Sequence, residues 1–175
     1  MGGKSEPLFK EQQTFPSRIY LALAVPPCIL LGLTIWQVGL GHSWGKQPMS
    51  NGRLIGWTVF TSLIYIRLIM VRLVTAVRSD GIIVSMRGLW RSRSIPIEGI
   101  KSVTTITYNA VAEYGGYGMR SGRNGKAYIA NGNEGVQLEL TTGGRVLIGS
   151  QRPRELISAI HSVIAPQQGA GKALS

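Results

Sequence analysis

Few residues in this chain can carry acid–base, metal or redox chemistry. Its 175 residues include one cysteine, two histidines and eight acidic side chains, of which only Asp80 is an aspartate. The lone Cys28 excludes an intrachain disulfide and a paired-cysteine metal site. It also lies in an apolar run, where burial disfavours a reactive thiolate. We therefore expect no metal, no cofactor and no small-molecule substrate.

The remaining candidates for catalysis are poorly placed. General acid–base catalysis needs a histidine with an orienting acid, or two carboxylates close together. We expect His42 in an external loop and His161 on the polar side of the last helix, on opposite sides of a membrane. No serine occurs in a G-x-S-x-G motif. The sequence gives no residue a catalytic role, and we expect that the protein is not an enzyme.

The glycine-rich stretch 127–156 could be a phosphate-binding loop that opens a helix, or a set of β-hairpins. A Walker-type loop needs G-x-x-x-x-G-K followed by serine or threonine, and this stretch has no such lysine. The segment VQLEL alternates apolar and polar residues, as a half-buried strand does. Its glycines therefore favour hairpin turns, where positive φ angles are needed.

Two long apolar runs predict membrane-spanning helices. Residues 19–40 contain no charge, and a helix of that length covers about 33 Å, enough to cross the hydrocarbon core. A secretory signal peptide is the alternative for this run, and a buried helix of a soluble protein is the alternative for residues 54–77. The second run contains Arg67 and Arg72, which either reach the headgroups or pair with a group inside the membrane.

Basic residues flank the two spans unevenly and predict their orientation. They are concentrated before residue 19 and after residue 66, whereas the loop 41–53 holds only two. By the positive-inside rule, both termini are cytoplasmic, the loop is external, and residues 1–18 form a cytoplasmic segment. We expect the inner (cytoplasmic) membrane.

Beyond residue 78 the sequence predicts an all-β domain, 79–165, built as an open barrel or sandwich of about seven strands. The expected strands are 81–86, 89–96, 101–109, 117–121, 126–131, 135–141 and 145–150, the first two joined around Arg87–Gly88. An amphipathic helix, 153–165, begins with Pro153 and caps the domain. Pro166 is expected to end this helix, leaving 166–175 as a flexible tail.

Two groups of residues are candidates for binding. From Arg67 onward there are 14 basic and 6 acidic residues, a net charge of +8. The predicted basic interaction face consists of Arg87, Arg91, Arg93, Arg120, Arg123 and Lys126, and the alternative is a solvated face near an anionic leaflet. The predicted aromatic contact loop consists of Tyr108, Tyr114, Tyr117 and Tyr128, which could instead close the edge of the barrel.

Two spans followed by GIIV…RG…R-x-R-x-IPIEGIKSV resemble the bacterial membrane-anchored families with a pleckstrin-homology-like (PH-like) domain. The segment 114–156, with GVQLEL and LIGSQRP, is similar to one such uncharacterised family, and the resemblance covers roughly residues 10–165. Arg154 stands where that family has an acid. The resemblance implies a fold and a topology, with no established activity. The arrangement of two spans followed by a small β-rich domain is also similar to that of the photosystem I assembly factor of chloroplasts and cyanobacteria.

These observations lead to two hypotheses of function. The first is a non-enzymatic accessory, assembly or scaffolding subunit of a larger membrane complex, with a photosynthetic or respiratory complex as a minority expectation. The second is a membrane-surface module that binds anionic lipid headgroups through its basic loops. Nucleic-acid binding is not expected, because no helix carries a basic recognition face and aromatic residues do not alternate with basic ones.

Overall fold

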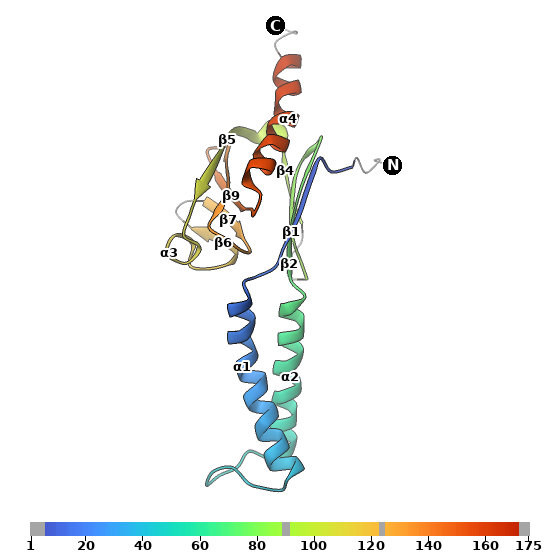
Figure 1. The fold of residues 1–175 in the computed structure, drawn as a ribbon, viewed down its shortest axis with the longest axis vertical. Helices are drawn as coiled ribbons and strands as arrows, with labels where there is room; N and C mark the ends of the chain where they lie inside the picture. Colours follow the sequence, from blue (N-terminus) through green and yellow to red (C-terminus); the bar gives the residue numbers. More distant parts are fainter. Residues whose placement is uncertain (1–5, 89–91, 123–124, 172–175) are drawn as a thin grey trace. The chain divides into compact units, whose positions relative to one another are not determined.

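The computed structural model describes residues 6–88, 92–122 and 125–171, with side chains up to residue 165. The chain divides into two compact units. The helical unit is Pro16–Val71, and the β-domain combines the residues up to Phe15 with those from Arg72 onward. The helical unit is therefore an insertion into the β-domain rather than a preceding domain (Figure 1).

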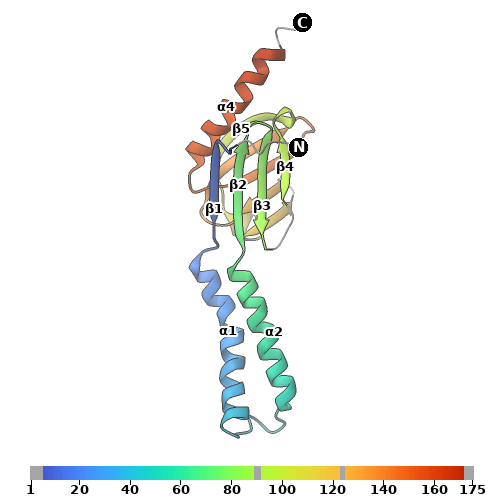
Figure 2. The same cartoon turned by 90° about the vertical axis from the view of Figure 1, so that its right-hand side faces the viewer.

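The helical unit is a hairpin of two helices lying side by side (Figures 1 and 2). The first is α1, Ser17–Thr34, continued by the π-helical η1, Ile35–Gly39, and the second is α2, Asn51–Ile69. The structure agrees with the prediction of a helix over 19–40 to within two residues at either end. Ser17–Gly39 and Asn51–Ile69 are both long and apolar enough to cross a membrane.

The second helix is shorter than the predicted 54–77, because it ends at Ile69 and the chain becomes strand β2, Arg72–Arg78. The sequence RLVTAVR is apolar enough to continue a helix, but its β-branched residues also suit a strand. The five residues between its two arginines are all buried. Pairing on both sides by β1 and β3 decides between the two conformations. Arg72 consequently lies in the β-domain and not inside a span, which corrects the prediction of intramembrane pairing for this residue.

Sheet A has four antiparallel strands in the order β1-β2-β3-β4. The two strands that follow β2 are β3, Gly81–Arg87, and β4, Arg93–Pro96. The fourth is β1, Phe9–Gln13, which pairs with β2 from Phe9 opposite Val77 to Gln13 opposite Leu73. Neither β1 nor β2 was predicted from the sequence. The domain therefore does not begin at residue 79, and residues 9–13 are not a separate N-terminal segment.

Sheet B has five strands in the order β5-β8-β9-β7-β6. All its pairs are antiparallel except β7 with β9. The strands are β5 (Ile100–Thr107), β6 (Gly118–Gly122), β7 (Gly125–Ile129), β8 (Glu134–Leu140) and β9 (Arg145–Gly149). Each of the seven predicted strands corresponds to one of β3–β9, although residues 89–91 of the predicted strand 89–96 lie outside the described residues. The described domain has nine strands rather than seven.

The domain core lies between the inner faces of the two sheets, which form two layers in Figure 2. The last helix, α4, Pro153–Gly171, contacts strands of both sheets, and its Leu156 and Ile160 are fully buried. The helix does not end at Pro166 as predicted, and residues up to Gly171 are helical. Proline has a helical φ and removes a single N–H donor, so it weakens a helix without necessarily ending it.

Two short helices lie within the β-domain. The 3₁₀ helix η2, Ile97–Gly99, joins the two sheets. The helix α3, Ala110–Tyr114, was not predicted, although its caps are readable in the sequence. The Asn109 side chain accepts hydrogen bonds from the backbone N–H groups of Val111 and Ala112, and Gly115 ends the helix with a φ of 71°.

Candidate functional site

The register of sheet A places Arg72 and Arg87 directly opposite each other on neighbouring strands. Residues in this relation point to the same face of a sheet. Here it is the outer face, because the adjacent Leu73 and Met86, also a pair, are buried on the inner face. Arg87 is exposed and Arg72 is half-buried. Arg87 was predicted as part of a basic face, but the pair was not, because Arg72 was expected in a helix.

The other predicted basic residues do not share a face with this pair. Arg93 lies opposite Val84, on the buried side of sheet A. Arg120 and Lys126 belong to the β6–β7 hairpin and pair with Ala127 and Ser121, neighbouring register positions that point to opposite faces. The structure therefore separates the described members of the predicted basic interaction face. Arg91 and Arg123 lie outside the described residues.

The predicted aromatic contact loop is largely part of a second core on the outer side of sheet B. Tyr108 and Tyr128 are both buried. Tyr108 packs with Ala127, Ile129 and Leu147, and Tyr114 and Tyr117 pack against this cluster. Tyr108, Tyr114 and Tyr117 therefore pack on this side of sheet B, whereas Tyr128, the register partner of Ile148, points to the opposite face.

Tyr108 is the most perturbed of these side chains. Its ring meets that of Tyr114 edge to face, with ring centroids 6.2 Å apart. Burial, with smaller contributions from Tyr117 and Tyr114, raises the pKa of Tyr108 to about 12. Burial, and then the charge of Glu113, raises the pKa of Tyr114 as well. The Tyr108 hydroxyl is buried without a hydrogen-bond partner among the described residues, so it can only remain neutral at ordinary pH.

A polar cluster that was not predicted from the sequence holds β1 to the loop between β9 and α4. The buried Glu11 carboxylate accepts hydrogen bonds from the Ser150 hydroxyl, at 2.6 Å, and from the Gln151 backbone N–H, at 2.9 Å. Gln13 donates to the Gly149 carbonyl at 2.8 Å, and Arg152 donates to the Lys10 carbonyl at 2.9 Å. The four residues after Phe9 are all polar, so the alternating burial of FKEQQ could not be predicted from its pattern.

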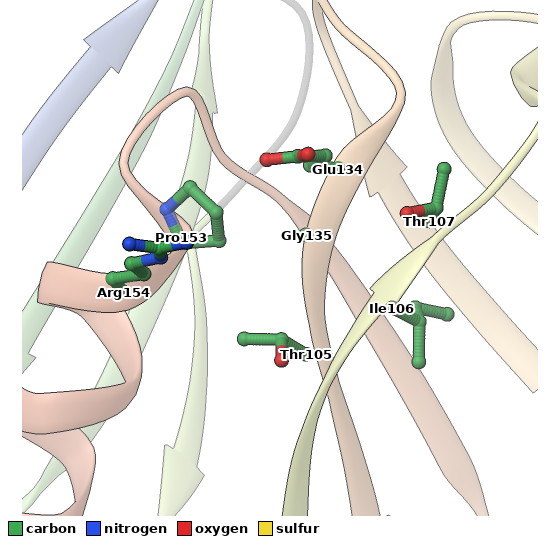
Figure 3. Close-up of a pocket in the computed structure, with 7 residues that line it drawn as sticks. All are labelled: Thr105, Ile106, Thr107, Glu134, Gly135, Pro153 and Arg154. Carbon is green, nitrogen blue, oxygen red and sulfur yellow. The ribbon is translucent and has the colours of Figure 1, made fainter.

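A small cavity of about 210 Å³ lies where β5, β8 and the start of α4 meet (Figure 3). Its wall includes the Thr105 and Thr107 side chains, the Glu134 carboxylate, Pro153 and Arg154, while Ile106 points away in Figure 3. Hydroxyl groups and charges of both signs can hold water or a small polar group. The cavity brings no histidine or thiol to these groups, and no cluster of metal-ligating side chains occurs within the ranges that the structure describes.

The two helices of the helical unit are joined by a polar contact. The hydroxyls of Thr34 and Thr58 lie 2.7 Å apart, so that either can donate to the other. The Thr34 hydroxyl also lies 2.8 Å from the Leu30 carbonyl, and the Thr58 hydroxyl lies 2.9 Å from the Leu54 carbonyl of its own helix and 3.2 Å from the Leu30 carbonyl of α1. Thr58 is buried, and Thr58 and Leu54 are the buried residues of α2. Arg67 lies in the last turn of α2, where a basic side chain complements the helix dipole.

Comparison with known proteins gives the chain a family but not an activity. No curated protein matches the sequence. Nothing in the comparisons supports the similarity to the photosystem I assembly factor. The model of one protein family, a family of unknown function (DUF6141), matches residues 3–167, which is nearly the whole chain, from before β1 to within α4. The chain therefore belongs to the DUF6141 family.

Proposed function

We propose that this protein is a non-enzymatic integral membrane scaffold or assembly subunit, which fixes a basic β-domain at the membrane surface for contact with other membrane subunits. The observation that carries the proposal is the apolar surface of the helical unit. Large apolar side chains remain exposed along both helices, for example Leu21 at 70%, Ile29 at 57% and Leu63 at 58% exposed. A hydrocarbon core covers such a surface.

The pairing of β1 with β2 supports a topology in which the two helices cross the membrane as a hairpin. Three residues separate β1 from α1, and two separate α2 from β2. Because Gln13 and Leu73 are strand partners, the start of α1 and the end of α2 emerge on the same side. Basic residues on the flanks favour the cytoplasmic side and the inner membrane.

The strand order supports a PH-like classification of the β-domain. If the β6–β7 hairpin is set aside as an insertion, the remaining strands are four antiparallel strands in sheet A and β5-β8-β9 in sheet B. These seven strands and the closing helix α4 correspond to the PH-like plan expected from the sequence. The β6–β7 hairpin then extends sheet B beyond β9 through the parallel β7–β9 pair.

A native pull-down tests the proposed function. Full-length protein is extracted from its own membranes in mild detergent, and the co-purifying proteins are identified and quantified by mass spectrometry. We expect a stoichiometric set of membrane subunits, and we expect Arg67→Leu to reduce their recovery. Recovery of the protein alone, with lipid as its companion, would count against a scaffold and favour a module that binds anionic lipid headgroups. The Arg72–Arg87 pair is the observation that favours this second candidate.

A further inference from the structure

We propose that Arg72 and Arg87 together bind the phosphate group of an anionic phospholipid at the end of the β2–β3 hairpin that is connected to α2. The site rests on the membrane anchoring proposed above, and it assigns a ligand to two residues that no known activity explains. Its three supports are the register of the strands, the distribution of charge along the hairpin and the length of chain between Arg72 and α2.

The register places two arginines side by side on one face of the sheet. Arg72 and Arg87 are direct cross-strand partners, which places their Cα atoms about 4.5–5.5 Å apart. Like charges in this position destabilise a sheet. A phosphate group between the two arginines offsets their repulsion, because each guanidinium can donate two parallel hydrogen bonds to phosphate oxygens. Ser85, diagonal to Arg72 on the same face, adds a hydroxyl donor nearby.

The charge along the hairpin favours an anion at this end. Asp80, in the turn between β2 and β3, lies at the opposite end, beyond the Arg78–Gly81 pair. Arg78 is six positions along the strand from Arg72, which is about 20 Å. Screening at physiological salt reduces the influence of Asp80 over that distance. Glu11, the acid in β1, points to the inner face and is engaged by Ser150 and Gln151.

The covalent chain holds the pair close to the end of α2. Arg72 is the third residue after Ile69, so it lies within about 11 Å of the last residue of that helix. If α2 crosses the bilayer, this distance places both arginines at the depth of the headgroups. An anionic phospholipid, which supplies a phosphate at that depth, is therefore favoured over an acidic protein or free phosphate.

Native mass spectrometry of the full-length protein in mild detergent tests the site. The protein is titrated with phosphatidylglycerol or with phosphatidylcholine, and the fraction of chains that retain one lipid is measured. The test variant is Arg72→Gln/Arg87→Gln. The matched control, Arg120→Gln/Lys126→Gln, removes the same two charges from the β6–β7 hairpin. The variant Arg72→Lys/Arg87→Lys keeps both charges but cannot form bidentate hydrogen bonds with a phosphate. Thermal unfolding of each variant checks that it is folded.

We expect wild-type protein and the Arg120→Gln/Lys126→Gln control to retain phosphatidylglycerol with a preference of roughly tenfold over phosphatidylcholine. The Arg72→Gln/Arg87→Gln variant should lose this preference, and the lysine variant should keep only part of it. The site is overturned if the glutamine variant retains phosphatidylglycerol as well as wild type does, or if the Arg120→Gln/Lys126→Gln control loses the preference to the same extent as the glutamine variant. Displacement of the lipid by millimolar inorganic phosphate would also overturn the assignment to a headgroup.

The same variants separate this site from the scaffold proposal. If Arg72→Gln/Arg87→Gln loses co-purifying protein subunits while its lipid preference is unchanged, the pair binds protein and the lipid site is wrong. If the lipid preference is lost while the subunits remain, the lipid site is supported and the scaffold proposal is untouched. Recovery of no subunits with any variant, wild type included, counts against the scaffold alone.

Discussion

At the residue scale, Tyr108 couples the stability of the domain to alkaline pH. Its pKa is about 12 in the folded protein against 10.0 for an unperturbed tyrosine. Below pH 10 the phenol is neutral in both states and its contribution to stability is complete. Between pH 10 and 12 the unfolded state ionises first, so the free energy of unfolding falls as pH rises, by up to about 2–3 kcal/mol.

Tyr108→Phe should make the stability less dependent on pH in this range, and it should cost little at pH 8, because the hydroxyl has no hydrogen-bond partner among the described residues. Thermal unfolding of wild type and variant at pH 8, 10 and 11 checks both effects. The difference between the two proteins isolates Tyr108 from the other tyrosines and the lysines. An equal fall in both proteins would show that Tyr108 is not the group responsible.

Glu11 is the second residue whose environment predicts a measurable effect. Glu11→Ala removes the acceptor of the hydrogen bonds from Ser150 and Gln151 and leaves the buried Ser150 hydroxyl without it. We expect a loss of about 2–4 kcal/mol of stability, because hydrogen bonds to a charged group are the strong ones. Chemical denaturation in detergent measures it. Glu11→Gln should be intermediate, and Glu6→Ala, which changes an exposed acid a few residues earlier, should have no effect.

At the element scale, the Thr34–Thr58 contact tests whether α1 and α2 associate as the structure shows. Thr58→Val removes the 2.7 Å hydrogen bond between the helices, and interhelical bonds of this kind contribute about 0.6 to 1.7 kcal/mol in membranes. We expect a loss of that size in unfolding by sodium dodecyl sulfate. Thr61→Val is the matched control, because the Thr61 hydroxyl donates only within α2, to the carbonyls of Trp57 and Thr58.

A double-mutant cycle sharpens this test. If Thr34 and Thr58 stabilise the hairpin through each other, Thr34→Val/Thr58→Val should cost less than the sum of the two single variants. Additive costs would mean that the two hydroxyls do not act through each other, and that each acts through a carbonyl, Leu30 for Thr34 and Leu54 or Leu30 for Thr58.

At the scale of the whole molecule, the insertion of the helical unit between β1 and β2 predicts which parts of the chain fold alone. A fragment of residues 79–166 lacks β1 and β2, so sheet A loses two of its four strands. We expect this fragment to be unfolded or aggregated, since it exposes the inner face and the edge of β3. Circular dichroism and the dispersion of amide NMR signals check this.

The complementary variant should fold as a soluble domain. Because Gln13 and Leu73 are paired, a two-residue Asn-Gly turn can replace residues 14–72 and close β1 and β2 into a hairpin. We expect cooperative thermal unfolding from this variant. If the 79–166 fragment folded and the joined variant did not, the assignment of β1 and β2 to the domain would be contradicted.

The sequence by itself determined the features that depend on local pattern. Strand alternation and glycine turns identified β3–β9, uncharged length identified α1, and Pro153 with the stripe from Leu156 to Ile160 identified the start of α4. Apolar composition alone could not say whether 72–78 continues a helix, because Val74, Thr75 and Val77 suit either conformation until β1 and β3 pair with them.

Only the tertiary structure decided which distant residues meet. Glu11 and Ser150 are 139 positions apart, and their hydrogen bond turns a polar N-terminal segment into a buried strand. The pairing of β2 with β3 places Arg72 opposite Arg87 and not in the predicted span. Tyr108 and Tyr128, which were predicted in an exposed contact loop, are buried in the structure. No local sequence pattern predicts such contacts, because the hydrogen-bond partner of each buried polar group lies far away in the sequence and reaches it only when the chain folds.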